Sequence, residues 1–159
     1  MSGEHHPHNR SLLKPAFRQF FFGLAPGNIG EASRFASSAG ETFGLSAEQQ
    51  DDLALVVGET VSNSFIHGHS GVLLSVAAGT GSIVWLQVFD RSQALPPMPT
   101  TADLDAESGR GLMICDALAP GWHVTRLDDG KVFCFPFPRN ADAVHTTPRP
   151  GALRHRSAA

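Results

Sequence analysis

Hydrophobic and polar positions change their spacing several times along the chain, and each change marks an expected element. Residues 17–24 are mostly aromatic and apolar and suit a strand, at an edge of the sheet because Arg18 and Gln19 lie within it. Apolar residues at helical spacing follow over 28–42 and stop near Gly44, which predicts a first helix.

A second, longer helix is expected from Ser46 to about His67. Ser46 and Gln49 have the spacing of a capping box, in which the two side chains satisfy the first free amides of a helix. A stripe at 3.6-residue spacing is expected to be buried, and its members are Leu53, Val56, Val57, Thr60, Val61 and Ser64. Gly68 and Gly71 end the helix.

The second half of the chain alternates β-rich runs with one loop and one helix. The glycine-rich turn at 79–81 predicts a hairpin, and Asp128, Asp129 and Gly130 predict another. In order, we expect strands at 72–78 and 82–90, a long loop or lid at 91–108, a helix at 111–118, and strands at 122–127 and 131–137.

This order predicts an α/β two-layer sandwich, in which helices cover one face of a mixed, mostly antiparallel sheet. We expect one folded domain at 16–138. Residues 1–15 and 139–159 are polar or rich in Pro and Arg, and they are expected to be disordered tails.

Composition narrows the function classes. The formal net charge is -3 and most basic residues are scattered, so the sequence offers no footprint for binding nucleic acid directly. It has neither a signal peptide nor a run of about 18 apolar residues, which predicts a cytoplasmic protein that is not embedded in a membrane. Cys115 and Cys134 lie in apolar contexts and are expected to be reduced packing residues.

One row of polar side chains is expected along the long helix. Glu59, Asn63 and His67 follow each other at steps of four residues, and each step advances about 40° around the helix. The row has two interpretations. It is a solvated face that ends in a histidine at the negative end of the helix dipole, or it lines a nucleotide site in which an amide binds Mg²⁺ and a carboxylate acts as a base.

Two further motifs bear on that choice. Asp90 ends the strand IVWLQVFD, where a carboxylate faces the crevice beyond the strand, although such residues also form turns. Gly109, Arg110 and Gly111 stand where the lid meets a helix, and their amides together with the helix dipole suit an anion. Glycines also serve any helix entry.

Taken in this order, the elements resemble the ATP-binding fold shared by histidine kinases, Hsp90-type chaperones, gyrase-type topoisomerases and MutL-type repair proteins, known as the Bergerat or GHKL fold. Within it, the segment VVGETVSNSFIHG closely resembles the anti-sigma-factor serine/threonine kinases of bacterial partner-switching systems. The resemblance covers about 17–137.

The resemblance implies a role for each motif residue. Glu59 would be the catalytic base or would position a water, Asn63 would reach Mg²⁺ and the phosphates, and Asp90 would accept a hydrogen bond from the adenine amino group. The remaining nucleotide-binding residues that it implies are His67 and Gly68 at the helix end and Gly109, Arg110, Gly111 and Leu112 at the phosphates.

The resemblance also implies an activity and partners. The family uses ATP and Mg²⁺, is often homodimeric, and sequesters a sigma factor while phosphorylating a serine on an antagonist protein. A second hypothesis is a binding module that grips a sigma factor or antagonist without turnover, with or without nucleotide. A third is the detached catalytic half of a histidine kinase, which is less favoured because no helix pair with a phosphoacceptor histidine precedes the domain.

One departure from the family pattern stands after the strand-ending aspartate. The family has Asp-x-Gly-x-Gly, whereas this chain places Ser92 and Ala94 at the two glycine positions after Asp90. Each adds a Cβ where close approach to the base is expected, which predicts weaker or altered nucleotide binding. Pro96, Pro97 and Pro99 also stiffen the lid.

Overall fold

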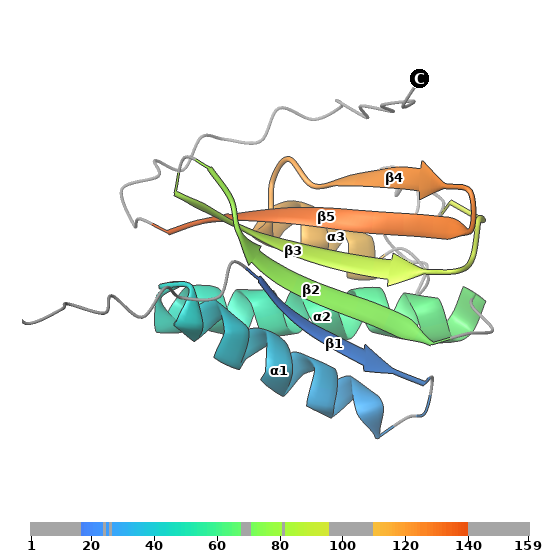
Figure 1. Cartoon of the computed structure of the whole chain (residues 1–159), viewed down its shortest axis with the longest axis horizontal. Coiled ribbons are helices and arrows are strands. Elements are labelled where there is room, and N and C mark those ends of the chain that lie inside the picture. Colours follow the sequence, from blue (N-terminus) through green and yellow to red (C-terminus); the bar gives the residue numbers. More distant parts are fainter. Residues whose placement is uncertain are drawn as a thin grey trace, which may run out of the picture.

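The computed structural model describes residues 17–23, 25, 27–67, 71–80, 82–95 and 110–139, with three helices and five strands in these ranges (Figure 1). The predicted helices and strands are all present, with ends that shift by at most two residues, whereas the predicted lid from residue 96 onward and the predicted tails, apart from residue 139, lie outside the described residues. Their bounds are β1 Phe17–Phe22, α1 Asn28–Thr42, α2 Ala47–His67, β2 Val72–Ala78, β3 Ile83–Asp90, α3 Arg110–Leu118, β4 His123–Leu127 and β5 Gly130–Pro138.

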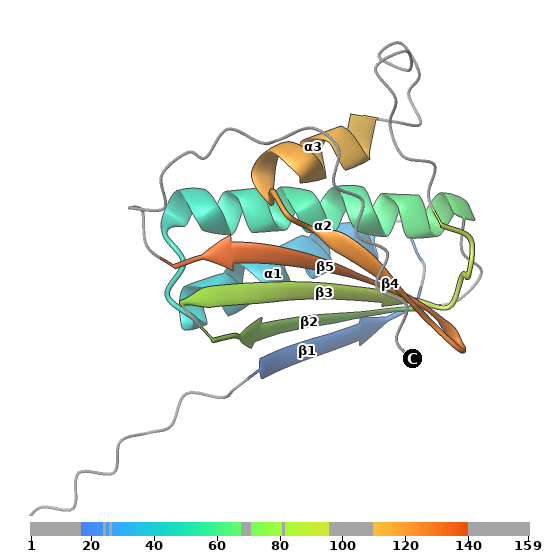
Figure 2. The ribbon, with the colours of Figure 1, turned by 90° about the horizontal axis from the view of Figure 1, so that it is seen from above.

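The strands form one sheet in the order β1-β2-β3-β5-β4. All three helices lie on one face of this sheet, and no described helix covers the other face (Figure 2). The predicted α/β two-layer sandwich is therefore confirmed. The sheet was expected to be mixed but mostly antiparallel, and each of the four pairings between the described strands is antiparallel.

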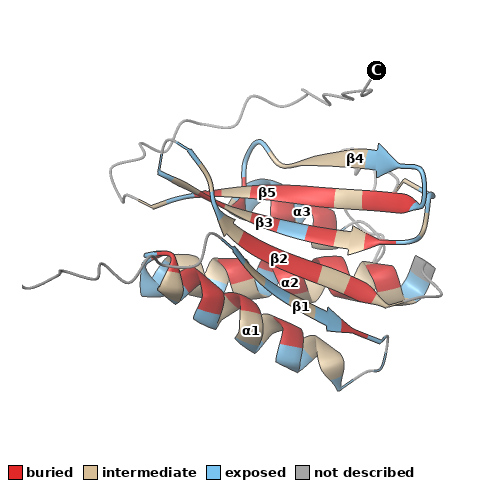
Figure 3. Ribbon diagram, viewed as in Figure 1, coloured by how far each residue is buried: buried red, intermediate tan, exposed pale blue. Residues whose placement is uncertain are grey.

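The core lies between the sheet and the helices. Alternate side chains of β3 are buried in it, as the two-residue period of a strand requires, whereas β2 and β5 also bury consecutive residues, and Figure 3 shows these bands. Small residues of α1 allow close packing, and the inward residues of β5 are large. Examples that are buried are Ala32, Ala36, Ala39, Phe133, Phe135 and Phe137.

The long helix α2 runs through the middle of this layer. The predicted capping box is present, because the Gln49 amide donates to Ser46 Oγ at 3.3 Å and the Ser46 amide donates to Gln49 Oε1 at 3.1 Å. All six residues of the predicted buried stripe are buried. The helix is thus fixed in rotation, and this decides where its polar row points.

Both cysteines are free and buried, which confirms that they are packing residues. Among the helices of the described ranges, none combines the length and the apolar character that a transmembrane span requires.

Candidate functional site

The polar row of α2 stands at the border of the core. Glu59 and Asn63 are half-buried, while the neighbouring Thr60 and Ser64 point inward and are buried. α2 ends at His67 as predicted; the His67 side chain and Gly68 lie outside the described residues. The polar row is therefore partly exposed at Glu59 and Asn63, where another element can pack against it.

That element is α3. A Cβ placed on Gly111 would lie 2.6 Å from Glu59 Oε2, so the first turn of α3 approaches the carboxylate as closely as only a glycine allows. Arg110 is exposed at the start of the helix, and Leu112 is buried in the core. Gly109 lies outside the described residues. The structure thus brings together two motifs that are about 50 residues apart in the sequence.

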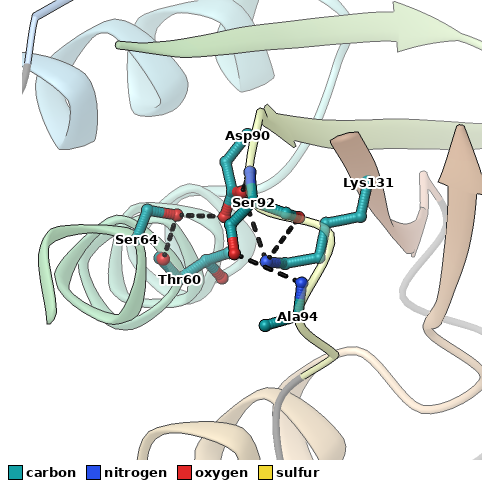
Figure 4. Close-up of polar contacts among 6 residues, drawn as sticks. All are labelled: Thr60, Ser64, Asp90, Ser92, Ala94 and Lys131. Atoms are coloured by element: carbon teal, nitrogen blue, oxygen red, sulfur yellow. Dashed lines mark hydrogen bonds and ion pairs between the residues drawn. The ribbon is translucent and has the colours of Figure 1, made fainter. Parts of the chain in front are cut away.

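Asp90 is the third candidate, and it lies at the end of β3 in the sheet, with its carboxylate in contact with α2. Only 3% of its surface is exposed. Ser64 Oγ of α2 donates to Asp90 Oδ2 at 3.0 Å, and the Ser92 amide donates to Asp90 Oδ1 at 2.6 Å (Figure 4). Since Ser64 follows Asn63 directly, the aspartate is tied to the helix that carries Glu59 and Asn63.

Lys131 completes this cluster, and the sequence interpretation missed it. Its Nζ lies 3.2 Å from Asp90 Oδ1 and donates to the Ser92 carbonyl oxygen at 3.0 Å (Figure 4). A sequence signal was present, because Lys131 shares its strand phase with the buried Phe133 and Phe135. A lysine in phase with core aromatics indicates a buried cation that needs a partner.

Gly130 was expected only as a turn residue, yet it also shapes the site. A Cβ at this position would overlap the Asp90 carbonyl oxygen and would lie 2.9 Å from Arg91 Cα. The backbone of β5 can therefore pass close to the end of β3 only with glycine here. This close passage is what allows Lys131 to reach Asp90.

The turn after Asp90 explains how the chain tolerates the two missing glycines. Among the described residues, positive φ angles occur only at Gly44, Ser82 and Gly121. Ser92 and Ala94 therefore adopt ordinary backbone conformations, and Ser92 Oγ accepts a hydrogen bond from the Ala94 amide at 3.3 Å. A hydrogen-bonded turn stands where the family has a flexible glycine pair.

The thiol of Cys115, whose pKa the charge of Glu59 affects, is unreactive at neutral pH. Cys115 of α3 is fully buried, and this burial raises the pKa of its thiol to about 11. A weak contact with Thr60 Oγ1 at 3.9 Å opposes the rise, and the charge of Glu59 adds to it. Because the thiolate is the nucleophilic form, Cys115 is a packing residue at neutral pH.

The described ranges contain no group of three or more His, Cys, Asp and Glu side chains arranged to hold a metal ion. The described residues of the site are one half-buried carboxylate and one amide on α2, a helix N-terminus beside the carboxylate, and a buried carboxylate paired with an ammonium.

Comparison with known proteins now bears on this arrangement. The family model of the histidine kinase-like ATPase domain matches residues 22–135. The chain belongs to the histidine kinase-like ATPase domain family. This match confirms the resemblance identified from the helix motif, and it spans α2, the end of β3 and the start of α3. No curated protein sequence matches the chain.

A solved structure shares the fold of this ATPase domain. It is the crystal structure of the RsbU and RsbW domains of Rv1364c from Mycobacterium tuberculosis, which superposes with a TM-score of 0.56 at 15% sequence identity. The alignment covers 76% of this chain and 32% of that chain, so our chain spans about a third of the protein it matches. At this identity the likeness concerns the fold alone.

Proposed function

We propose that this ATPase domain is an anti-sigma regulatory factor that transfers phosphate from ATP to a serine on an antagonist protein. One observation carries the proposal: the N-terminal turn of α3 lies against Glu59, with Gly111 at the point of contact. A helix N-terminus attracts phosphate, and a carboxylate beside it can serve the incoming hydroxyl. Family membership and the RsbW domain in the structural neighbour add support.

In this proposal ATP lies between α2, the end of β3 and the start of α3. Asp90 accepts a hydrogen bond from the adenine amino group, and Asn63 contributes its amide oxygen to Mg²⁺. The phosphates meet the amides at the start of α3, with charge from Arg110. The other residues assigned to nucleotide binding are His67, Gly68, Gly109, Gly111 and Leu112. A site with few protein ligands suits Mg²⁺, which is usually held jointly by the protein, substrate phosphates and water.

The phosphate transfer itself requires little covalent chemistry from the protein. The serine oxygen forms a bond to the γ-phosphorus, the bond to the β-phosphate oxygen breaks, and ADP leaves. Glu59 accepts the proton of the serine hydroxyl. Such reactions depend on position and on stabilisation of charge, which a fixed helix with one carboxylate and one amide can supply.

The partners and location follow from the same proposal. The chain acts in the cytoplasm, binds a sigma factor and its antagonist, and forms a homodimer. It has no direct contact with nucleic acid, consistent with its net charge of -3.

A second candidate function is a protein-interaction module without kinase turnover. The observation that favours it is the state of Asp90, whose carboxylate is 3% exposed and already bound by Ser64, Ser92 and Lys131. A sigma factor or antagonist could be gripped by this fold with the aspartate serving only to hold the helix and sheet together.

Phosphate transfer tests the two candidates. The purified chain is incubated with labelled ATP, Mg²⁺ and candidate antagonist proteins, and any phosphoserine is mapped. In Glu59→Ala, transfer is lost while binding of Mg-ATP in a calorimeter is kept. Glu48→Ala is the matched control, because Glu48 is an exposed carboxylate in the first turn of the same helix. Unaltered transfer by Glu59→Ala removes the mechanism. An unaltered chain that binds no nucleotide supports the interaction module.

A further inference from the structure

Lys131 is a buried cation that the proposed reaction does not use. It is the register partner of Asp90 across β3 and β5, and both residues are 3% exposed. Its Nζ donates to Asp90 Oδ1 and to the Ser92 carbonyl oxygen. The next inward residues of β5 are Phe133 and Phe135, so Lys131 begins an inward row that is otherwise aromatic.

Stability alone does not account for this lysine. Two charges lose their hydration on burial, and replacing a buried ion pair by packed apolar side chains is often neutral or stabilising. What the lysine adds over an apolar residue is a set of directed N–H donors.

Within the described part of the chain, Asp90 and Lys131 each keep one hydrogen-bonding position without a partner. A carboxylate can accept about four hydrogen bonds, and Asp90 receives three from described residues: Ser64 on Oδ2, and Ser92 and Lys131 on Oδ1. An ammonium has three N–H groups, and Lys131 uses two of them within the described part of the chain. Among the described residues, one acceptor position on Asp90 Oδ2 and one N–H of Lys131 Nζ have no partner.

We propose that Lys131 is a specificity-determining residue of the nucleobase site: its remaining N–H donates to ring nitrogen N1 of adenine while Asp90 Oδ2 accepts from the adjacent amino group. The inference rests on the proposed function, because it assumes that Asp90 receives the base. Adenine presents one donor and one acceptor next to each other on this edge. Guanine presents one acceptor followed by two donors, and the pair has a single acceptor position to offer.

Burial of the pair affects all bases alike. Since both side chains are almost fully covered, neighbouring groups must shift before any base can enter. That cost is common to every nucleotide, so it lowers all affinities together and leaves their ratio to be set by the hydrogen bonds. In a site shielded from water, a donor without a matching acceptor is expensive, which sharpens the discrimination.

The test compares ligands that differ at one ring atom. Calorimetry measures binding of Mg-ADP and of the 1-deaza analogue, in which N1 is a C–H group and the amino group is kept. The unaltered chain should prefer ADP by about tenfold, which corresponds to about 1.4 kcal/mol for a hydrogen bond from a charged donor. In Lys131→Met the two affinities should agree within about twofold, and Lys131→Gln, which keeps a neutral donor, should restore part of the preference.

Each outcome decides a separate point. Equal affinities of the unaltered chain for ADP and its 1-deaza analogue overturn the role of Lys131, and this arm needs no variant that might fail to fold. A preference that persists in folded Lys131→Met overturns it as well. Absence of any ADP binding by the unaltered chain instead overturns the proposed function itself, and with it the base site. GDP should bind at least about tenfold more weakly than ADP.

Discussion

Gly111→Ala separates the position of the catalytic carboxylate from the binding of nucleotide. The added Cβ would stand 2.6 Å from Glu59 Oε2, whereas ordinary contacts begin at 3.4 Å. The carboxylate must therefore retreat by about 0.8 Å, and it can do so because it is the end of a flexible side chain. The backbone of α3 has no need to move, since the next contact, with Glu59 Cβ, is an ordinary 3.5 Å.

The expected consequence is a loss of rate with the fold preserved. A misplacement of about 1 Å in a reacting group costs on the order of 10²-fold in rate. Alanine is the better helix former by about 0.5–1 kcal/mol, so the free energy of unfolding should stay level or rise slightly. The assay is phosphate transfer under saturating Mg-ATP, with the affinity for Mg-ATP measured by calorimetry on the same samples.

Gly58→Ala is the matched control. It makes the same chemical change one residue before Glu59, and its Cβ would meet only Ser33 Oγ at an ordinary 3.8 Å. We expect this variant to keep both rate and affinity. Full transfer activity in Gly111→Ala would refute the claim that Glu59 acts where α3 holds it. A fall in affinity equal to the fall in rate would show that Gly111 acts through nucleotide binding alone and not through the position of Glu59.

Four further changes test other parts of the structure. Asp90→Asn should weaken ATP and ADP by about 1–3 kcal/mol in calorimetry, because it removes a charged acceptor from a buried site; unchanged affinities would place the base elsewhere. Gly130→Ala should lower the free energy of urea unfolding by about 1–3 kcal/mol, since its Cβ would meet backbone rather than a mobile side chain; unaltered stability would contradict the close passage of β5. Phe135→Ala removes a fully buried ring and should cost about 3–5 kcal/mol in the same assay, and a small effect would show that the core is not packed as described. The contribution of the Cys115 thiol to the free energy of unfolding should be fully present below pH 9 and should fall by about 2–3 kcal/mol between pH 9 and 11, because the folded thiol keeps its proton to about pH 11 whereas the unfolded thiol loses it near 9; Cys115→Ala should lack this part of the slope.

The architecture was predictable because its signals are local. The capping box at Ser46 and the period of the α2 stripe fix the start and rotation of that helix from adjacent residues alone. The turn at 128–130 likewise fixes the register of β4 and β5. Local sequence patterns also predicted that Glu59 and Asn63 lie on one face of α2 and that Asp90 ends a strand.

The pairing of Asp90 with Lys131 could not be obtained in this way. It depends on β5 lying beside β3 in the sheet, although α3 and β4 separate these two strands in the sequence. Local patterns identify strands but do not order them in a sheet. The contact of Gly111 with Glu59 was not predicted, because the packing of α3 on α2 involves residues far apart in the chain; the family resemblance implied only that both residues belong to one nucleotide site.

The substitutions at the glycine positions and the buried lysine have one physical explanation. A glycine pair leaves the segment after the aspartate free to adapt to a ligand, whereas here Ser92 is held through its amide, its carbonyl oxygen and its hydroxyl. Two of these three hydrogen bonds end on the Asp90–Lys131 pair. The turn is therefore fixed by the same pair of charges. Because the turn is already ordered, binding of a ligand that matches the pair would cost this segment less conformational entropy, although the groups that cover the pair must still shift to admit it.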